Sequence, residues 1–167
     1  GTPASQTTIA SFLAGASATD NVGVVGAVTN DAPVTFPIGI TTVTFTASDA
    51  QTNTGSATAT VTVADQTAPV ITLTGLASVT VAQGSVYVDA GSTVTDNVDT
   101  GLIATVTGTV DTAVVGTYTL SFDVTDAAAN VSTTVTRTVN VTDQTAPVIT
   151  LTGLASVTVA QGSVYVD

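Results

Sequence analysis

Hydrophobic and polar residues alternate with a period of two along most of the chain. In residues 116–125, every second position is apolar and the positions between hold Thr, Ser or Asp; the apolar residues are Tyr118, Leu120, Phe122 and Val124. Residues 56–64 follow the same rule, with Ala or Val alternating with Ser or Thr. Such alternation is typical of strands in an antiparallel sheet with one packed face and one wet face. Since no segment keeps a helical period over many residues, we expect an all-β protein with no helix of useful length.

Clusters of Asp, Asn and Gly separate these alternating runs, at residues 20–23 (DNVG) and 96–101 (DNVDTG). These residue types favour turns, because Asp and Asn bond to their own backbone and Gly adopts positive φ angles. A shorter break, AAAN at residues 127–130, lies between two strand-like runs. We therefore expect residues 117–125 and 131–142 to form a hairpin.

One long segment occurs twice. Residues 65–89, DQTAPVITLTGLASVTVAQGSVYVD, are repeated letter for letter as residues 143–167, at an offset of 78 residues. Weaker matches align GITTVTFTASDAQTN (39–53) with GTYTLSFDVTDAAAN (116–130), and ATDNV with VTDNV. The period fits one small β-sandwich domain, and the Pro in each DQTAP stiffens the joint between neighbours. These joints predict a tandem array of domains.

Three parts follow from these joints: a first domain at 1–64, a complete second domain at 65–142, and the opening strands of a further domain at 143–167. Nothing before Ser11 corresponds to the PVITLTG opening, so we expect the first domain to lack its first strands. Two interpretations of the ends stay open. In one, the chain is a window on a longer covalent array. In the other, the last segment inserts into the first domain of the next molecule, and strand donation by five apolar residues builds a filament: Val148, Ile149, Leu151, Val157 and Val159. Both interpretations predict strands at 143–167, packed on a sandwich.

Motifs in both units resemble known families. Residues 65–142, with APVITLTG, YVDAGSTVTDNVDTG and VGTYTLSFDVTDAAANVSTTVTRTVNVTD, are similar to the bacterial Ig-like repeats of large surface proteins. The first domain, with GASATDNVG, FPIGITTVTFTASDA and ATATVTVAD, resembles hyalin-repeat (HYR) domains. The resemblance implies tandem immunoglobulin-like antiparallel β-sandwich domains, outside the cell on a bacterial surface. It is less specific for function, because such modules serve as spacers, adhesin stalks and enzyme appendages.

Charge and missing residue types narrow the possible functions. The 167 residues include 12 acidic side chains, a single base and no His or Cys, which gives a formal net charge of −11. An acidic surface repels phosphate backbones, so we expect no nucleic-acid partner. Without His, Cys, Lys or Glu, the usual triads, Schiff bases and glutamate pairs cannot be built, and we expect no enzyme. No apolar run is long enough to predict a membrane span.

Several polar residues are expected to meet at one end of the second domain. In an Ig-like sandwich, the loop between the second and third strands lies beside the loop of the last hairpin, where the chain enters the domain. These loops and the entering linker carry four carboxylates and one amide: Asp65, Asp96, Asn97, Asp99 and Asp126. Ca²⁺ takes about six to eight oxygen ligands of these types. The group therefore indicates either a Ca²⁺ site or a set of solvated turn residues.

The leading hypothesis is a structural stalk or fibre segment of an extracellular surface filament or adhesin, giving length and stiffness. Its partners would be neighbouring Ig-like domains of the same chain, or of identical subunits in a linear polymer. The alternatives are a ligand-binding adhesin module that recognises glycan or ice, and an accessory domain of a secreted enzyme. The few Phe and Tyr residues mostly fall on inward positions of the strands, which disfavours an aromatic binding surface.

Overall fold

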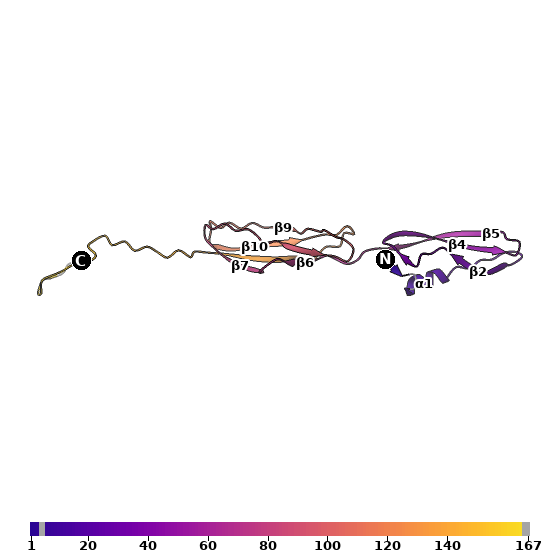
Figure 1. Cartoon of the computed structure of the whole chain (residues 1–167), viewed down its shortest axis with the longest axis horizontal. Coiled ribbons are helices and arrows are strands. Elements are labelled where there is room, and N and C mark those ends of the chain that lie inside the picture. Colours follow the sequence, from indigo (N-terminus) through magenta and orange to yellow (C-terminus); the bar gives the residue numbers. More distant parts are fainter. Residues whose placement is uncertain (4–5, 165–167) are drawn as a thin grey trace. The chain divides into compact units, whose positions relative to one another are not determined.

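The computed structural model describes residues 1–3 and 6–164 and is built mostly of β-strands. The predicted all-β fold class is confirmed, and the described residues include one short helix (Figure 1). In chain order the elements are β1 (Thr2–Pro3), α1 (Thr7–Ala14), β2 (Val24–Asn30), β3 (Thr35–Phe36), β4 (Gly39–Asp49), β5 (Thr54–Val63), β6 (Val70–Leu73), β7 (Ser78–Ala82), β8 (Ser92–Thr95), β9 (Thr105–Thr107), β10 (Gly116–Asp123) and β11 (Val135–Thr142).

The chain groups into two compact units, and each draws on several stretches of sequence. The first comprises Gly1–Thr72, Ser92–Thr105 and Phe122–Val135. The second comprises Leu73–Gly91, Val106–Ser121 and the residues from Thr136 onward. This grouping does not follow the sequence repeat, and the ranges 1–64, 65–142 and 143–167 stay a prediction. Residues 4–5 and 165–167, which belong to the first and last of these ranges, lie outside the described residues.

The first unit holds a three-stranded antiparallel sheet in the order β2-β4-β5. Val43 and Phe45, at inward positions of β4, are buried, and the neighbouring inward residues Thr41 and Ala47 are half-buried. Val43 and Phe45 of this strand form a core cluster with Phe36 of β3 and Ile9 of α1. β3 in turn pairs antiparallel with β1, so the first residues of the chain are bound to the same unit.

Helix α1 is a short helix that the strand pattern did not indicate. Its eight residues place Ile9, Phe12 and Leu13 at the i, i+3, i+4 spacing of a helical face. Ile9 is buried in the core cluster, and the ring of Phe12 meets Phe45 edge-on at a centroid distance of 5.8 Å. A helix this short is not stable alone, so packing on the core holds it. Residues before Ser11 thus form β1 and the start of α1, where the second domain has strands.

Beyond the linker, four strands form a sheet in the order β7-β11-β10-β9, and β6 pairs with β8. β10 and β11 are neighbours, as expected for the last hairpin. The inward side chains Leu120, Phe122 and Val124 are buried, which confirms the period of two. One pairing departs from the antiparallel expectation, because β7 runs parallel to β11. A parallel pair needs a long crossover connection, and here β8, β9 and β10 lie in the intervening chain.

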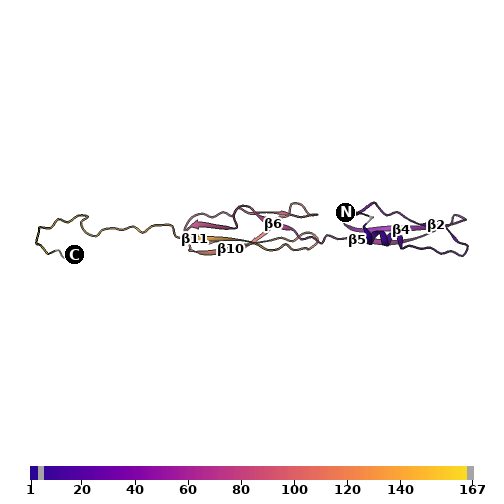
Figure 2. The same cartoon turned by 90° about the horizontal axis from the view of Figure 1, so that it is seen from below.

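Residues 143–164 form no strand or helix, although they repeat the sequence of β6 and β7 (Figures 1 and 2). The strands expected for this segment are therefore absent from its described part. The five apolar residues considered as strand donors are all exposed, from 52% for Val159 to 89% for Val148. A strand needs a partner for its backbone groups, and this copy of the sequence has none in the described chain.

Candidate metal centre

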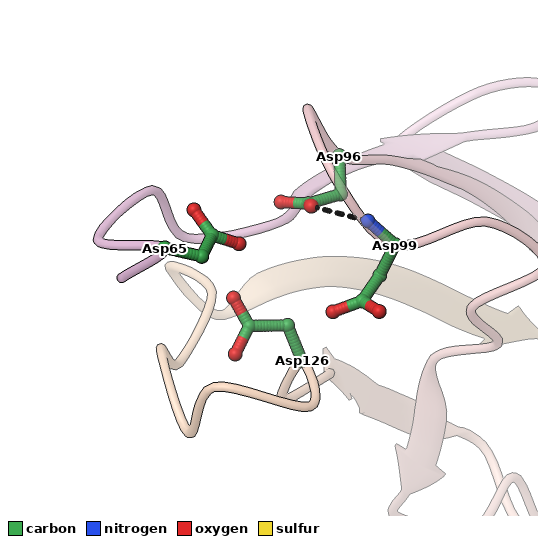
Figure 3. Close-up of side chains that lie close together, drawn as sticks. All are labelled: Asp65, Asp96, Asp99 and Asp126. Carbon is green, nitrogen blue, oxygen red and sulfur yellow. Dashed lines mark hydrogen bonds between the residues drawn. The ribbon is translucent and has the colours of Figure 1, made fainter. Parts of the chain in front are cut away.

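Asp96 lies in the turn that follows β8, where DNV interrupts the strand pattern. Its Oδ2 atom accepts a hydrogen bond from the backbone N–H of Val98, at 2.8 Å. The same atom accepts a second bond from the N–H of Asp99, at 2.9 Å (Figure 3). These backbone bonds lower the pKa of the Asp96 carboxyl below its ordinary value of 3.8. The turn therefore favours the ionised form of the side chain.

Asp126 lies in the turn that follows β10, and one residue holds both of its carboxylate oxygens. Oδ1 accepts the backbone N–H of Asn130 and Oδ2 accepts the side-chain amide of Asn130, each at 2.7 Å. The turn includes Ala129 in the left-handed region, at a φ of 69°. Asp126 is buried, and Asn130 also donates to the backbone oxygen of Asp65 at 3.3 Å. The turn is thereby bound to the linker.

Asp65 and Asp99 complete the group, and Asn97 lies beside it. Asp99 Oδ2 accepts the N–H of Ala127 at 3.0 Å, which joins the two turns. Asp65 Oδ1 accepts the N–H of Thr67 at 3.0 Å and lies 3.4 Å from Nδ2 of Asn97. Asn97 thus presents its amide nitrogen to the linker, whereas the sequence suggested it as an oxygen donor.

The four carboxylates face one another (Figure 3). Each of Asp65, Asp96, Asp99 and Asp126 offers one oxygen, and these oxygens all lie within 4.8 Å of one another. Two carboxylate oxygens, Asp65 Oδ2 and Asp96 Oδ1, are buried without a hydrogen-bond partner. An unpartnered buried acceptor is costly, and like charges this close repel. The arrangement is chemically suited to hold a hard cation.

The first domain repeats half of this arrangement. Asp20 and Asp49 correspond in the alignment to two members of the cluster, Asp96 and Asp126, and hold their turns with equivalent hydrogen bonds. At the position of a third member, Asp99, the first domain has a Gly. The two carboxylates line a hollow of about 280 Å³ but join no group of three or more metal-ligating side chains among the described residues. This half-built site is an internal control for the complete one.

A second polar site, around Arg137, was not anticipated from the sequence. Arg137 is the only base in the chain, and its side chain is 1% exposed. Its guanidinium forms an ion pair with Asp89 at 2.6 Å. It also donates hydrogen bonds to three backbone oxygens, those of Thr74 at 2.5 Å, Leu76 at 3.0 Å and Gly91 at 3.3 Å. The side chain therefore binds the turn after β6 to the chain before β8.

Asp89 is held from three sides. Besides the ion pair, it accepts the hydroxyl of Tyr87 at 2.7 Å and the N–H of Gly91 at 2.7 Å. Burial raises the pKa of Asp89, but the bonds from Arg137 and Tyr87 outweigh burial and bring the pKa below 3.8. The sequence held one indication of this site. Arg137 occupies an inward position of β11, on the same side of the strand as Val135, Val139 and Val141.

The strand pattern, the sheets and the buried inward residues define an all-β protein of immunoglobulin-like sandwich domains. Comparison with known families makes this more specific. Residues 71–141 match the family of bacterial surface protein Ig-like domains, and residues 2–63 match the HYR domain family. The chain thus combines an HYR domain with a bacterial surface Ig-like domain, which confirms the resemblance seen in the motifs. It is a module of an extracellular surface protein, of a kind that is typically non-catalytic.

No curated protein matches the chain. One of the solved structures that match is a lipoprotein from Bacteroides thetaiotaomicron, with 24% sequence identity and a TM-score of 0.40. The match covers 47% of this chain and 40% of the lipoprotein chain, so the present chain spans well under two thirds of that protein. Within the described part of the chain, no helix has the length and apolarity needed to cross a membrane.

Proposed function

We propose that this chain is a structural stalk segment of an extracellular surface protein, in which Ca²⁺ fixes the linker at Asp65 to the domain that follows it. The observation that carries the proposal is the convergence of four carboxylate oxygens within 4.8 Å of one another. Three of the carboxylates belong to turns of the second domain and the fourth belongs to the linker. The role involves no catalysis. Its partners are neighbouring Ig-like domains of the same chain or of identical subunits.

The donor set fits Ca²⁺. Carboxylate oxygens are its preferred ligands, and it accepts about six to eight of them in flexible geometry, whereas Mg²⁺ demands a near-ideal octahedron and keeps several waters. Asp65, Asp96, Asp99 and Asp126 would hold the ion, with the two unpartnered oxygens of Asp65 and Asp96 as its first ligands. A bound Ca²⁺ supplies two positive charges where four negative charges meet.

Charge repulsion among the carboxylates supports a linker that a bound cation holds more firmly in place. Two unit charges about 4 Å apart repel by roughly 1 kcal/mol in water, and by roughly 4 kcal/mol at the effective dielectric near a protein surface. Asp65 is the one member of the cluster that lies in the DQTAP linker, so repulsion from the three turn carboxylates acts to drive the linker away. Removing one of these negative charges should therefore abolish the stabilisation by Ca²⁺. Without Ca²⁺, the same change should leave the melting temperature equal or higher.

The test uses the full chain with conservative substitutions. Asp65→Asn and Asp96→Asn keep an oxygen that can accept the local backbone N–H groups, but each removes one charge. Asp20→Asn in the first domain is the matched control, because its carboxylate holds the same kind of turn through Val22 and Gly23. Calorimetry should show that Ca²⁺ raises the melting temperature of the wild type and the control. At a hundredfold excess over Kd the gain is about 2.7 kcal/mol.

Asp65→Asn and Asp96→Asn should lose this response and, in EGTA, melt at or above the wild-type temperature. Identical melting of the wild type in Ca²⁺ and EGTA would contradict the calcium assignment. An unchanged response in Asp96→Asn would place the ion elsewhere. The stalk role has a separate readout: labels in the first and second domains should show a narrower distance distribution with Ca²⁺ in the wild type, and no narrowing in Asp65→Asn.

A further inference from the structure

Asn130 contacts two of the four residues whose carboxylates form the cluster. Its side-chain nitrogen donates to Asp126 Oδ2 at 2.7 Å and to the backbone oxygen of Asp65 at 3.3 Å. A side-chain amide has two N–H donors, so one NH₂ group can serve both bonds. One acceptor lies in the turn after β10 and the other lies in the linker. A single planar group therefore joins two separate parts of the site.

The same bonds determine which oxygen atoms are left for a cation. Asn130 holds the backbone oxygen of Asp65, and the N–H of Thr67 holds Asp65 Oδ1 at 3.0 Å. The remaining oxygen of Asp65, Oδ2, is buried without a hydrogen-bond partner. At Asp126, the backbone N–H and the side-chain amide of Asn130 each hold one carboxylate oxygen at 2.7 Å. Both side chains are therefore oriented before an ion binds, as outer residues of metal sites orient the ligands.

The Asn130 amide also favours the approach of the linker to the turn. Asp65 and Asp126 each carry a negative charge, and each places an oxygen in the group whose members lie within 4.8 Å of one another (Figure 3). Without an ion, repulsion between these charges opposes the docking of the linker. A neutral amide that bonds to both residues favours docking and adds no charge. Docking of the linker and binding of an ion therefore require the same arrangement of these residues.

The first domain contains the same turn without a bond to a linker. Asp49 and Asn53 correspond in the alignment to Asp126 and Asn130. The backbone N–H of Asn53 donates to Asp49 Oδ1 at 2.9 Å, and its amide donates to Asp49 Oδ2 at 2.7 Å. In the described part of the chain, the Asn53 amide bonds to Asp49 and to no linker residue. The turn therefore needs one donor of this amide, and the bond of Asn130 to the linker is an addition to it.

We infer that Asn130 is a positioning residue that couples the binding of Ca²⁺ to the docking of the linker. The inference rests on the proposed calcium site and assigns a role to a residue outside the four carboxylates. Coupling between two equilibria is reciprocal: the docked linker raises the affinity for Ca²⁺ by the same factor by which Ca²⁺ favours the docked linker. Loss of the Asn130 amide lowers this factor, and it should weaken Ca²⁺ binding by about tenfold to a hundredfold.

The experiment compares Asn130→Ala with Asn53→Ala in the full chain. Each variant loses an amide that holds an Asp in an equivalent turn, but only Asn130→Ala loses a bond to the linker. Isothermal titration with CaCl₂ should give a Kd about tenfold to a hundredfold higher for Asn130→Ala, and the wild-type Kd for Asn53→Ala. If Asn130→Ala does not fold without metal, the Ca²⁺ dependence of its melting temperature gives the same ratio of affinities.

A second measurement follows the linker without any metal. Labels in the first and second domains should show a broader distance distribution for Asn130→Ala than for the wild type in EGTA. Asn53→Ala should give the wild-type distribution, because its turn has no bond to the linker in the described chain. An unchanged distribution in Asn130→Ala would show that the amide does not hold the linker, and it would overturn the inference.

The titration of the wild type separates this inference from the calcium assignment. If the wild type does not bind Ca²⁺, the calcium assignment is wrong and the coupling fails with it. If the wild type binds Ca²⁺ and Asn130→Ala binds it with the same Kd, the coupling alone is overturned. Equal weakening of Ca²⁺ binding in Asn53→Ala would also overturn the coupling, because a loss common to both turns does not act through the linker.

Discussion

Replacing Arg137 by Met should destabilise the second domain more than most single changes in the chain. Met retains much of the apolar stem and removes the guanidinium. Asp89 then loses its ion pair, and the backbone oxygens of Thr74, Leu76 and Gly91 lose their donor. Removing one partner of a buried ion pair costs about 3–5 kcal/mol, because the remaining charge stays uncompensated.

The magnitude follows from the exposure of the two partners. Arg137 is 1% exposed, but the side chain of Asp89 is 22% exposed, so water relieves part of the cost. We therefore expect the lower end of the range, about 3 kcal/mol, against a typical domain stability of about 5–15 kcal/mol. For a domain of this size 1 kcal/mol shifts the melting temperature by about 4–8 °C, so the expected loss is about 12–24 °C.

The assay is calorimetry of the full chain at neutral pH. Arg137→Lys keeps the charge but not the planar fork, so its loss should be intermediate. In a double variant, Arg137→Met with Asp89→Leu, no charge is left unpaired, and stability should recover in part. A melting temperature of Arg137→Met within about 3 °C of the wild type would refute the reasoning, as would a double variant less stable than either single one.

Two further predictions follow from the same contacts. The pKa of Asp89 and that of Asp96 are lowered on folding, so both ionised carboxylates stabilise the fold above pH 3.8. This stabilisation is lost as the pH falls below 3.8. In melts over a series of pH values, Asp89→Asn should therefore reduce the fall in melting temperature at acid pH. Gly108→Ala should strongly destabilise the chain, because the new Cβ meets the carbonyl oxygen of Thr119 and φ is 97°. Gly101→Ala has open space around the new Cβ and a φ of 73°, so only backbone strain should lower its stability, and by a smaller amount. Equal losses of stability in the two variants would contradict the steric argument.

Strand positions were predictable because they depend on local alternation. Leu120, Phe122 and Val124 lie on one parity and are all buried. Helix α1 was missed because its signal covers only eight residues, and those residues are helical through packing of Ile9 and Phe12 on a core built later in the chain. The parallel pairing of β7 with β11 has no local signal either, because it depends on which strands meet after the crossover.

The two polar sites differ in what the sequence reveals. Asp and Asn mark turns, and the order of strands in a sandwich predicts which turns share an end, so the meeting of Asp65, Asp96 and Asp126 could be expected. For Arg137, the sequence indicated only that the side chain occupies an inward position of β11. Its partners include backbone oxygens, which any residue type can present, so no pattern of side chains reveals them.

The repeated segment separates what a sequence determines from what its surroundings determine. Residues 65–86 and 143–164 are identical, and they share the Asp-capped start and the turn with Gly at positive φ. They differ in strand content and burial, since β6 and β7 exist only where β8 and β11 are present as partners. Turns are therefore local properties of this segment, whereas its strands depend jointly on the segment and on its partner strands β8 and β11. It follows that a change outside the segment, such as Arg137→Met, weakens the packing of residues 65–86 without altering their sequence.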